Sequence, residues 1–268
     1  MNKVLIITSG SLRHMYFANS IVKSFKTISF KIIFEGNLIL PKKLNLKKSG
    51  DIIKDHFNLR QSSEYEFFSG SEKILLQNEK ILNLEKGEIN TDEIIKIISD
   101  FNPSLIITYG CSIIRPRLID LFKNKIINVH LGLSPYYRGA GTNFHALVNN
   151  EFHFFGYSII YIDKGIDTGE IIHQARPKIT NNDTPHKIGN RLIKKMTKDL
   201  ISLISNFNLI EKKPSITTDY DCKLFMIKDA DASATQRLYD NFQDNLKNYI
   251  INRNYLVKKF PIIKQNFI

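Results

Sequence analysis

Lys125-Ile126-Ile127-Asn128-Val129-His130 is an apolar run that ends in two polar side chains. Asn128 and His130 are two residues apart, so on an extended strand both side chains point to the same face. Such a pair is badly placed in a core. It suits the crevice at the carboxyl edge of a parallel sheet, where open α/β folds bind ligands. The run therefore predicts a strand that ends in an active site.

Similar apolar runs occur on both sides of this stretch and alternate with helical patterns. This alternation predicts an α/β fold with a mostly parallel, twisted sheet and helices on both faces. We expect strands at 3–8, 30–34, 104–109, 126–130, 156–162 and 171–179, and helices at about 12–25, 51–68, 91–101, 142–149 and 185–203, with a short helix from about 116.

Two of the helices carry start signals in the sequence. Asn90 and Glu93 are three residues apart, as in a capping box, so we expect Asn90 to open the third helix. Asp183 or Thr184 is expected to cap the long helix, with Pro185 at a tolerated early position.

The helix near 51–68 carries His56, Arg60 and Glu64 at intervals of four residues, on one helical face. We favour a solvated face, with Phe57 and Phe67 turned inward. A face that lines a cleft is the alternative.

The pattern breaks around Lys212-Lys213-Pro214. We therefore expect a catalytic domain over 1–210 and a small C-terminal α+β appendage over 211–268. The appendage should contain a short strand near 224–227 and a helix over about 232–250. One side of that helix could pack on its own domain or on a second subunit, which leaves a homodimer open: Leu238, Tyr239, Phe242, Leu246 and Tyr249.

The chain has 38 Lys and Arg against 26 Asp and Glu, a net charge of +12. Most of the lysines are scattered, and the one local cluster, Lys42 to Lys48, has no interleaved aromatics, so nucleic acid is not the expected partner. The basic background favours phosphorylated or nucleotide-linked substrates.

Cys111 and Cys222 are isolated and show no zinc spacing, so we expect a reducing compartment and no metal. No signal-peptide pattern and no apolar run of membrane-spanning length occurs in the sequence. We therefore expect a soluble cytoplasmic protein that does not contact a membrane.

The first strand is followed by Ser9-Gly10-Ser11 and then by Arg13 and His14. Free amides at the start of the next helix could hold an anion there, and Arg13 and His14 would add positive charge. An ordinary strand–helix turn with a serine cap is an equal alternative. If the turn holds an anion, Ser9, Gly10, Ser11, Arg13 and His14 would bind a substrate.

After the opening stretch, the chain continues through Pro135-Tyr136-Tyr137-Arg138-Gly139 to the loop Asp163-Lys164-Gly165-Ile166-Asp167-Thr168-Gly169. An amide donor, a histidine and an aspartate suit attack on a carbonyl. Asn128 and His130 would donate hydrogen bonds to the developing oxyanion. Asp167 would orient His130 or accept the proton of the nucleophile. No Ser or Cys lies at a nucleophile elbow, which favours acyl transfer to an amine without a covalent enzyme intermediate.

These three pieces, Asn128-x-His130, Pro135-x-Tyr137-Arg138-Gly139 and Asp163-x-Gly165-x-Asp167-Thr168-Gly169, resemble the formyltransferase family that uses 10-formyltetrahydrofolate. The family includes methionyl-tRNA, glycinamide ribonucleotide and sugar N-formyltransferases. The resemblance implies a Rossmann-like fold and the catalytic residues Asn128, His130 and Asp167. It also implies a folate site formed by Tyr109, Gly110, Cys111, Ser112, Ile113, Ile114, Asp163 and Gly165.

The sequence departs from the family pattern at Gly132-Leu133-Ser134-Pro135, where relatives usually read Ser-Leu-Leu-Pro. The appendage is also shorter than the β-barrel domain of the tRNA enzymes, and the first turn lacks the Gly-Asn-Gly-Ser phosphate turn of the glycinamide ribonucleotide enzymes. We therefore favour a small amine acceptor, an amino sugar linked to a nucleotide or phosphate. Arg138 and His145 are further candidate acceptor contacts.

Four alternatives remain at this point. Methionyl-tRNA or glycinamide ribonucleotide could be the acceptor, or water could be, which would make the protein a formyltetrahydrofolate hydrolase. A folate-binding, nucleotide-binding or basic nucleic-acid-binding module that keeps the fold without the reaction is the non-enzyme alternative.

Overall fold

The computed structural model describes residues 1–39, 50–71, 73, 76–77 and 80–268. The lysine cluster from Lys42 to Lys48, with the surface loop expected around it, lies outside the described residues.

In the described part of the chain, seven strands form one sheet in the order β3-β2-β1-β4-β5-β7-β8. The first five of these run parallel, and β7 and β8 pair antiparallel at the other edge. The predicted α/β fold with a mostly parallel sheet is confirmed. The strands are β1 (Lys3–Ser11), β2 (Ser29–Ile39), β3 (Ile81–Leu84), which the sequence did not predict, β4 (Leu105–Tyr109), β5 (Ile126–His130), β7 (Tyr157–Tyr161) and β8 (Ile171–Ala175).

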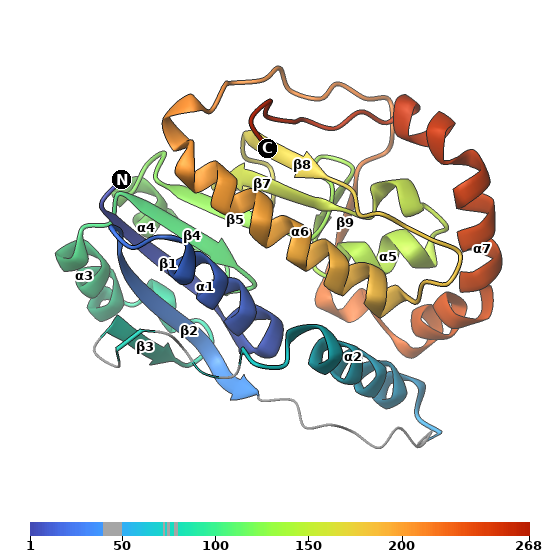
Figure 1. Cartoon of the computed structure of the whole chain (residues 1–268), viewed down its shortest axis with the longest axis horizontal. Coiled ribbons are helices and arrows are strands. Elements are labelled where there is room, and N and C mark those ends of the chain that lie inside the picture. Colours follow the sequence, from blue (N-terminus) through green and yellow to red (C-terminus); the bar gives the residue numbers. More distant parts are fainter. Residues whose placement is uncertain (40–49, 72, 74–75, 78–79) are drawn as a thin grey trace.

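Two hydrophobic clusters form on opposite faces of this sheet. Val4 and Ile6 of β1 join one cluster, and Leu5 and Ile7 join the other, as the alternation of a strand buried on both faces requires. The first cluster includes α1 (Leu12–Ser24) and α6 (Pro185–Ser205), which lie across the near face of the sheet in Figure 1. The second includes α3 (Asp92–Phe101) and α4 (Pro116–Leu121).

The remaining helices lie on the right in Figure 1, on the side toward which the parallel strands point. They are α2 (Ile52–Phe68), α5 (Thr142–Val148) and α7 (Ala232–Lys259), with short 3₁₀ segments at Glu88–Asn90, Phe152–Phe154, Phe207–Leu209 and Ile227–Asp229. A small second sheet pairs β6 (Tyr137–Gly139) with β9 (Lys223–Phe225) in parallel. This pairing joins the loop after β5 to the C-terminal part of the chain.

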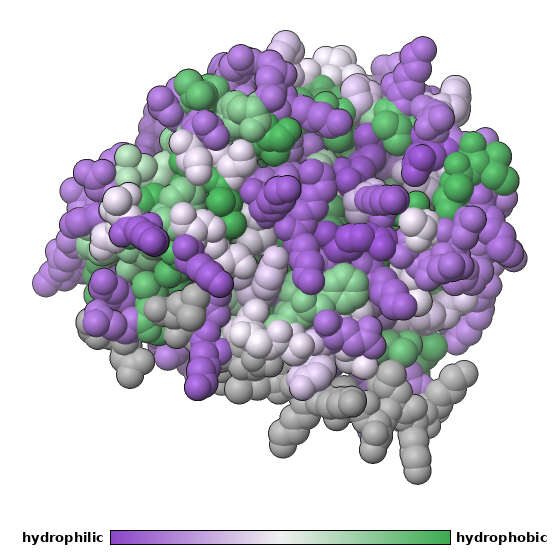
Figure 2. Space-filling view, in the orientation of Figure 1, coloured by the Kyte–Doolittle hydropathy of each residue, from purple (hydrophilic) through white to green (hydrophobic). Residues whose placement is uncertain are grey.

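The long α7 packs on its own chain. Its buried side chains include Leu238, Phe242, Leu246 and Tyr249, and the ring of Phe152 stacks on Tyr249 at 5.5 Å between centroids. Ile251 stays 79% exposed, and Figure 2 shows hydrophobic residues gathered over this end of α7 at the right edge of the molecule. The predicted side of α7 is thus covered by its own chain, and a homodimer remains a prediction.

The last residues of the chain run along β8. Gln174 N donates to Ile263 O at 2.7 Å, and Gln265 Nε2 donates to Ile172 O at 3.0 Å. Residues 211–268 thus contact the sheet at β8 and the loop after β5 at β6. The division of the chain near residue 210 stays a prediction.

One predicted helix start is wrong. The N-cap of α3 is Thr91, and its side chain makes no capping hydrogen bond. The side-chain amide of Asn90 instead binds the backbone of the segment between β4 and α4. It donates to Ile113 O at 3.0 Å and accepts from Arg115 N at 2.8 Å. The longer helix begins as expected, because Thr184 accepts from Lys187 N and Pro185 takes the first helical position.

None of the helices among the described residues is both long and apolar enough to span a membrane.

Candidate active site

A large open cavity of about 1170 Å³ lies at the carboxyl ends of β4 and β5. This is the edge where the polar pair of the opening stretch was expected. Its lining comes from the loops after β4, β5 and β7, from α2 and α6, and from the segment after β9. The volume exceeds the ~300–1,000 Å³ typical of pockets for one small ligand, so two ligands can meet inside it.

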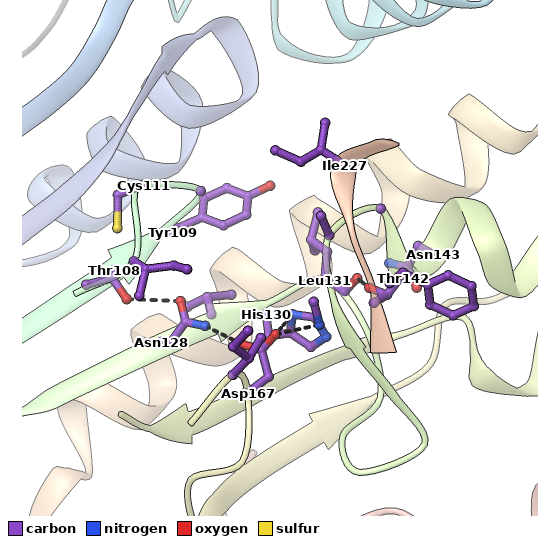
Figure 3. Close-up of a pocket in the computed structure, with 18 of the residues that line it drawn as sticks. Thr108, Tyr109, Cys111, Asn128, His130, Leu131, Thr142, Asn143, Asp167 and Ile227 are labelled. Carbon is purple, nitrogen blue, oxygen red and sulfur yellow. Dashed lines mark hydrogen bonds and ion pairs between the residues drawn. The ribbon is translucent and has the colours of Figure 1, made fainter. Parts of the chain in front are cut away.

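Asn128, His130 and Asp167 meet in this cavity, as predicted (Figure 3). Asn128 Nδ2 donates to Asp167 Oδ1 at 3.1 Å, and His130 Nδ1 lies 3.2 Å from Asp167 Oδ2. Gly139 N also donates to Asp167 Oδ2 at 2.9 Å. The carboxylate therefore joins the strand β5 to the loop that carries β6. It does so from a left-handed backbone position, φ +51°, which Asp tolerates better than most residues.

Both ring nitrogens of His130 face oxygen atoms. Nδ1 faces Asp167, and Nε2 lies 3.0 Å from the carbonyl oxygen of Tyr137. A ring that carries protons on both nitrogens can donate to both acceptors at once. The ring is 6% exposed, so its orientation is fixed by these two contacts and by the packing around it.

Gly132 makes room for this ring. A Cβ at position 132 would overlap His130 Nε2 and Thr142 Oγ1 well inside van der Waals contact. The departure from Ser-Leu-Leu-Pro thus has a local structural effect: the imidazole fills the space that a side chain at 132 would need.

Thr108 is a site residue that was not predicted from the sequence. It pairs with Asn128 in the β4–β5 register, and its Oγ1 donates to Asn128 Oδ1 at 2.9 Å. With its oxygen held by Thr108, the amide of Asn128 is oriented so that its nitrogen faces Asp167. A hydroxyl next to the end of a neighbouring apolar strand was the available sequence signal.

The predicted folate loop, Tyr109 to Ile114, lines the cavity and is held by a buried carboxylate. Glu35 in β2 is 5% exposed and accepts hydrogen bonds from Ser112 N and from Gly87 N. Burial and the nearby Glu35 raise the pKa of the Cys111 thiol to about 12, so Cys111 is not a nucleophile at neutral pH. Glu35 went unnoticed in the sequence, although a lone acidic residue ending an apolar run was its signal.

The other predicted folate residues, Asp163 and Gly165, also line the cavity. Asp163 Oδ1 accepts from Gly165 N at 3.0 Å and from Thr168 Oγ1 at 2.8 Å. Asp163 therefore orders the loop that carries Asp167.

The five residues predicted to bind a substrate after the first strand fall into two groups. Arg13 and His14 line the cavity, whereas Ser9, Gly10 and Ser11 do not. The reason is that β1 continues through Ser11 and α1 begins at Leu12, so no free turn separates strand from helix. Any anion held here would contact side chains of α1.

The face of α2 with His56, Arg60 and Glu64 lines the cavity. The favoured interpretation as a solvated face was wrong, and the cleft alternative is correct. Phe57, which was expected to turn inward, is 49% exposed. The spacing identified a face, but the partner of that face is α1, because Glu64 Oε1 lies 3.4 Å from Arg13 on that helix.

His56 continues this wall toward α6 and α7. His56 Nδ1 and His186 Nε2 lie 2.9 and 3.1 Å from the hydroxyl of Tyr239. Burial lowers the pKa of His56 to about 4 and that of His186 to about 3, with nearby positive charge on Arg60 acting in the same direction. Both rings are neutral at physiological pH.

Arg138 and His145 do not line the cavity directly. Arg138 lies in β6, and the ring of His145 stacks on Phe225 at 4.0 Å between centroids. Phe225, Met226 and Ile227 themselves reach the cavity, and Figure 3 shows Ile227 across the opening from Tyr109.

A carboxylate also fastens this C-terminal segment to the loop that carries β6. Glu151 accepts from the hydroxyls of Tyr137 and Tyr220 and from Lys223 Nζ. Because the carbonyl of Tyr137 contacts His130, this network supports the position of the histidine. Among the described residues, no group of three or more His, Cys, Asp or Glu is arranged to hold a metal ion.

Comparison with known proteins agrees with this geometry. The family model for formyl transferases matches residues 52–204. The methionyl-tRNA formyltransferase of Finegoldia magna is 34% identical over 118 residues, which is 43% of this chain and 37% of that protein. The matches to the first curated relatives span between 37% and 43% of their lengths.

Solved structures share the fold, among them two formyltransferases. A sugar N-formyltransferase from Shewanella sp FDAARGOS_354 aligns with a TM-score of 0.56 at 17% identity, covering 85% of this chain and 78% of that one. The formyltransferase PseJ from Anoxybacillus kamchatkensis, in complex with UDP-4,6-dideoxy-4-formamido-L-AltNAc and tetrahydrofolate, aligns with a TM-score of 0.52 at 22% identity, covering 88% and 97%. The family model matches more than half of the 268 residues, and it includes β4, β5 and the loop with Asp167; the chain belongs to the formyl transferase family.

Proposed function

We propose that this protein transfers the formyl group of 10-formyltetrahydrofolate to the primary amine of a small acceptor. The observation that carries the proposal is the Asp167 carboxylate, which contacts both Asn128 and His130 inside a cavity large enough for two ligands. Family membership supports the same reaction.

The donor fits the loops on the β4 side of the cavity. The backbone and side chains from Tyr109 to Ile114 would hold the pterin, and the loop with Asp163 and Gly165 would close over it. Ile113 and Ile166 line this region and are 73% and 38% exposed, so a flat heteroaromatic ring would cover apolar surface that water now contacts. When bound, 10-formyltetrahydrofolate supplies the formyl carbon and a nitrogen leaving group.

Asn128 stabilises the negative charge that develops on the formyl oxygen. Its amide carries two N–H donors, and Asp167 accepts one of them at 3.1 Å. The second donates to the oxyanion. A single donor of this kind contributes about 10²–10³ in kcat in other acyl-transfer enzymes.

Asp167 accepts the proton of the amine, and His130 holds Asp167 in place. A bond forms between the amine nitrogen and the formyl carbon, the bond to the folate nitrogen breaks, and the amine must lose one proton. The carboxylate of Asp167 accepts that proton, directly or through one water, while its contact with His130 keeps it in place. The proton then passes to the leaving nitrogen, so the products are a formamide and tetrahydrofolate.

An amino sugar linked to a nucleotide or phosphate is the acceptor that we favour. The basic side chains of Arg13 and Arg60 in the cavity support it, and PseJ, a fold relative, was solved with such a product. Methionyl-tRNA is the second candidate, because the first curated relatives are methionyl-tRNA formyltransferases.

The test is release of tetrahydrofolate from 10-formyltetrahydrofolate, followed by absorbance. Parallel reactions contain pooled nucleotide-linked amino sugars, glycinamide ribonucleotide, methionyl-tRNA or water alone. We expect turnover with the nucleotide-linked sugars and a loss of about 10²-fold or more in Asn128→Ala.

Turnover with water alone would reassign the protein as a hydrolase, and turnover with methionyl-tRNA would select the second acceptor. If the wild-type protein binds tetrahydrofolate but turns over with no acceptor, the amine class is wrong. Absence of folate binding would refute the proposed function as a whole.

A further inference from the structure

The end of the cavity between α1 and α2 carries more positive than negative charge. Arg60 Nε lies 2.9 Å from Glu64 Oε1, and an Nη atom of Arg13 lies 3.4 Å from the same oxygen. Two guanidinium groups therefore share one carboxylate oxygen, and one positive charge is left uncompensated within the cluster. Glu64 is nearly buried, with 6% of its side chain exposed, while both arginines remain partly open to the cavity.

The two arginines are close enough to repel each other. The charge of Arg13 is the main cause that lowers the pKa of the Arg60 guanidinium, ahead of burial, and Glu64 offsets only part of it. A bound anion between the two groups would remove this repulsion. Guanidinium groups suit such an anion, because their planar N–H donors match the oxygens of phosphate.

Buried polar groups without partners surround the same place. His14 is 4% exposed and lines the cavity, and neither of its ring nitrogens makes a hydrogen bond among the described residues. The hydroxyl of Tyr109, which is 2% exposed, also lacks a partner there. The two rings touch edge to face, 4.4 Å between centroids. Buried donors without acceptors are costly, so a ligand that accepts from them gains affinity.

These two donors stay neutral at physiological pH. Burial, with the positive charges of Arg13 and Arg60, lowers the pKa of His14 well below its usual value, and the backbone of Ser9 acts in the opposite direction. Burial raises the pKa of Tyr109 to about 12. The cluster therefore offers two cations and two neutral donors around a single carboxylate that is already paired twice.

We propose that Arg13, Arg60 and His14 form a subsite for a phosphate group of the acceptor. The subsite uses side chains of α1 and α2 and differs from a phosphate turn after the first strand, since Ser9 to Ser11 do not reach the cavity. The assignment of this phosphate to the acceptor rests on the proposed function, whereas the binding of phosphate at this subsite does not.

The alternative anion is the carboxylate tail of the folate donor. The cavity has other cations for it, because Arg115 directly follows the proposed folate loop and Lys86 lies next to Gly87, which Glu35 fastens to that loop. Arg13 and Arg60 come from α1 and α2 rather than from these loops, and the contact with the folate loop on this side is the ring of His14 against Tyr109. The phosphate source is therefore favoured.

The experiment is titration calorimetry of the full-length protein with inorganic pyrophosphate and, separately, with tetrahydrofolate. Arg60→Gln removes one guanidinium and leaves Glu64 paired with Arg13. Lys54→Gln is the matched control, because Lys54 is an exposed cation on the same helix outside the cavity. We expect Arg60→Gln to weaken pyrophosphate about 10- to 100-fold, Lys54→Gln to change it less than about 2-fold, and tetrahydrofolate affinity to stay the same in both.

Three results would overturn the proposal. Wild-type protein could fail to bind pyrophosphate at millimolar concentration, Arg60→Gln could bind it as tightly as wild type, or Arg60→Gln could weaken tetrahydrofolate but not a pterin that lacks the glutamate tail. The last result would assign the arginines to the donor. If tetrahydrofolate does not bind and no acceptor is formylated, the proposed function fails, while Arg60-dependent pyrophosphate binding would still establish the subsite.

Discussion

The cavity has two walls of different origin. The strand wall consists of the ends of β4 and β5 with the Asp167 loop, and the helical wall consists of the α2 face with His56, Arg60 and Glu64. Asn128, His130 and Asp167 of the strand wall were identified from the sequence, whereas Thr108 was missed. The residues of the helical wall were placed in solvent, and they line the cavity instead.

The difference follows from how each wall is positioned. On a strand the side-chain period is two residues, so Asn128 and His130 share a face whatever the strand packs against. A helical face is also fixed by spacing, but only the tertiary arrangement decides what lies opposite it. For α2 the neighbour is α1, with the Arg13–Glu64 pair at 3.4 Å, and no local pattern contains that contact.

The largest expected effect tests the strand wall. Asp167→Asn keeps the size of the side chain, tolerates the left-handed backbone and can still accept from Gly139 N. It removes the charge beside His130 and the proposed proton acceptor. We expect kcat to fall about 10²- to 10⁴-fold while the melting temperature changes little, measured by tetrahydrofolate release and thermal denaturation.

Asp163→Asn is the matched variant for this test. Asp163 lies on the same loop, and its carboxylate accepts hydrogen bonds from Gly165 and Thr168 of that loop. Its replacement should raise KM for the donor more than it lowers kcat. Equal losses of kcat in both variants would show that Asp167 acts only by ordering the loop.

A smaller effect is expected at Gly132, where the sequence departs from its relatives. In Gly132→Ala the new Cβ overlaps His130 Nε2 and Thr142 Oγ1, so the ring must leave the carbonyl of Tyr137. We expect kcat to fall about 10-fold and stability to drop by about 1–3 kcal/mol, as for other overpacked sites. Urea denaturation and steady-state kinetics measure the two effects.

Gly189→Ala is the control for the Gly132 variant, since a Cβ at that helical position meets nothing within 4 Å. Unchanged kinetics in Gly132→Ala would mean that the His130–Tyr137 contact has no role in turnover. That outcome would limit the catalytic role of the strand wall to Asn128 and Asp167.

The smallest effect concerns the helical wall and its pH dependence. His56 has a pKa of about 4 in the folded protein, because burial and Arg60 disfavour its charged form, against about 6.5 in an unfolded chain. Between these values the unfolded chain binds more protons, so stability is full above pH 6.5 and falls as the pH drops toward 4. In His56→Gln this loss should shrink.

The measurement is the melting temperature at pH 7.5 and pH 5.0. We expect the decrease on acidification to be about 2–4 °C smaller in His56→Gln than in wild type, the scale of a modest stability change in a domain of this size. Gln can still bond with the Tyr239 hydroxyl, and Lys54→Gln serves as a control on the same helix. Equal decreases in all three proteins would show that the pKa of His56 is not lowered in the folded protein.

The sequence predicted the fold class and most elements because their signals are local. Apolar runs bounded by turns marked six of the strands, and Thr184 with Pro185 marked the start of α6. The short β3 lacked such a run. Asn90 was misassigned as a helix cap because its amide is used by Ile113 and Arg115, 23 and 25 residues away.

The sequence by itself determined the sheet and the polar residues at its edge. The period of two placed Asn128 and His130 together, and the resemblance of the Asp163–Gly169 loop to the formyltransferase motif marked Asp167 as their partner. Only the tertiary structure decided what completes the site. Glu35 holds the 110–114 loop, Glu151 fastens the C-terminal segment, and α2 brings Arg60 beside Arg13. These contacts join residues that are far apart in the chain, and their positions depend on how whole helices and strands pack together. No local pattern of residues encodes that packing.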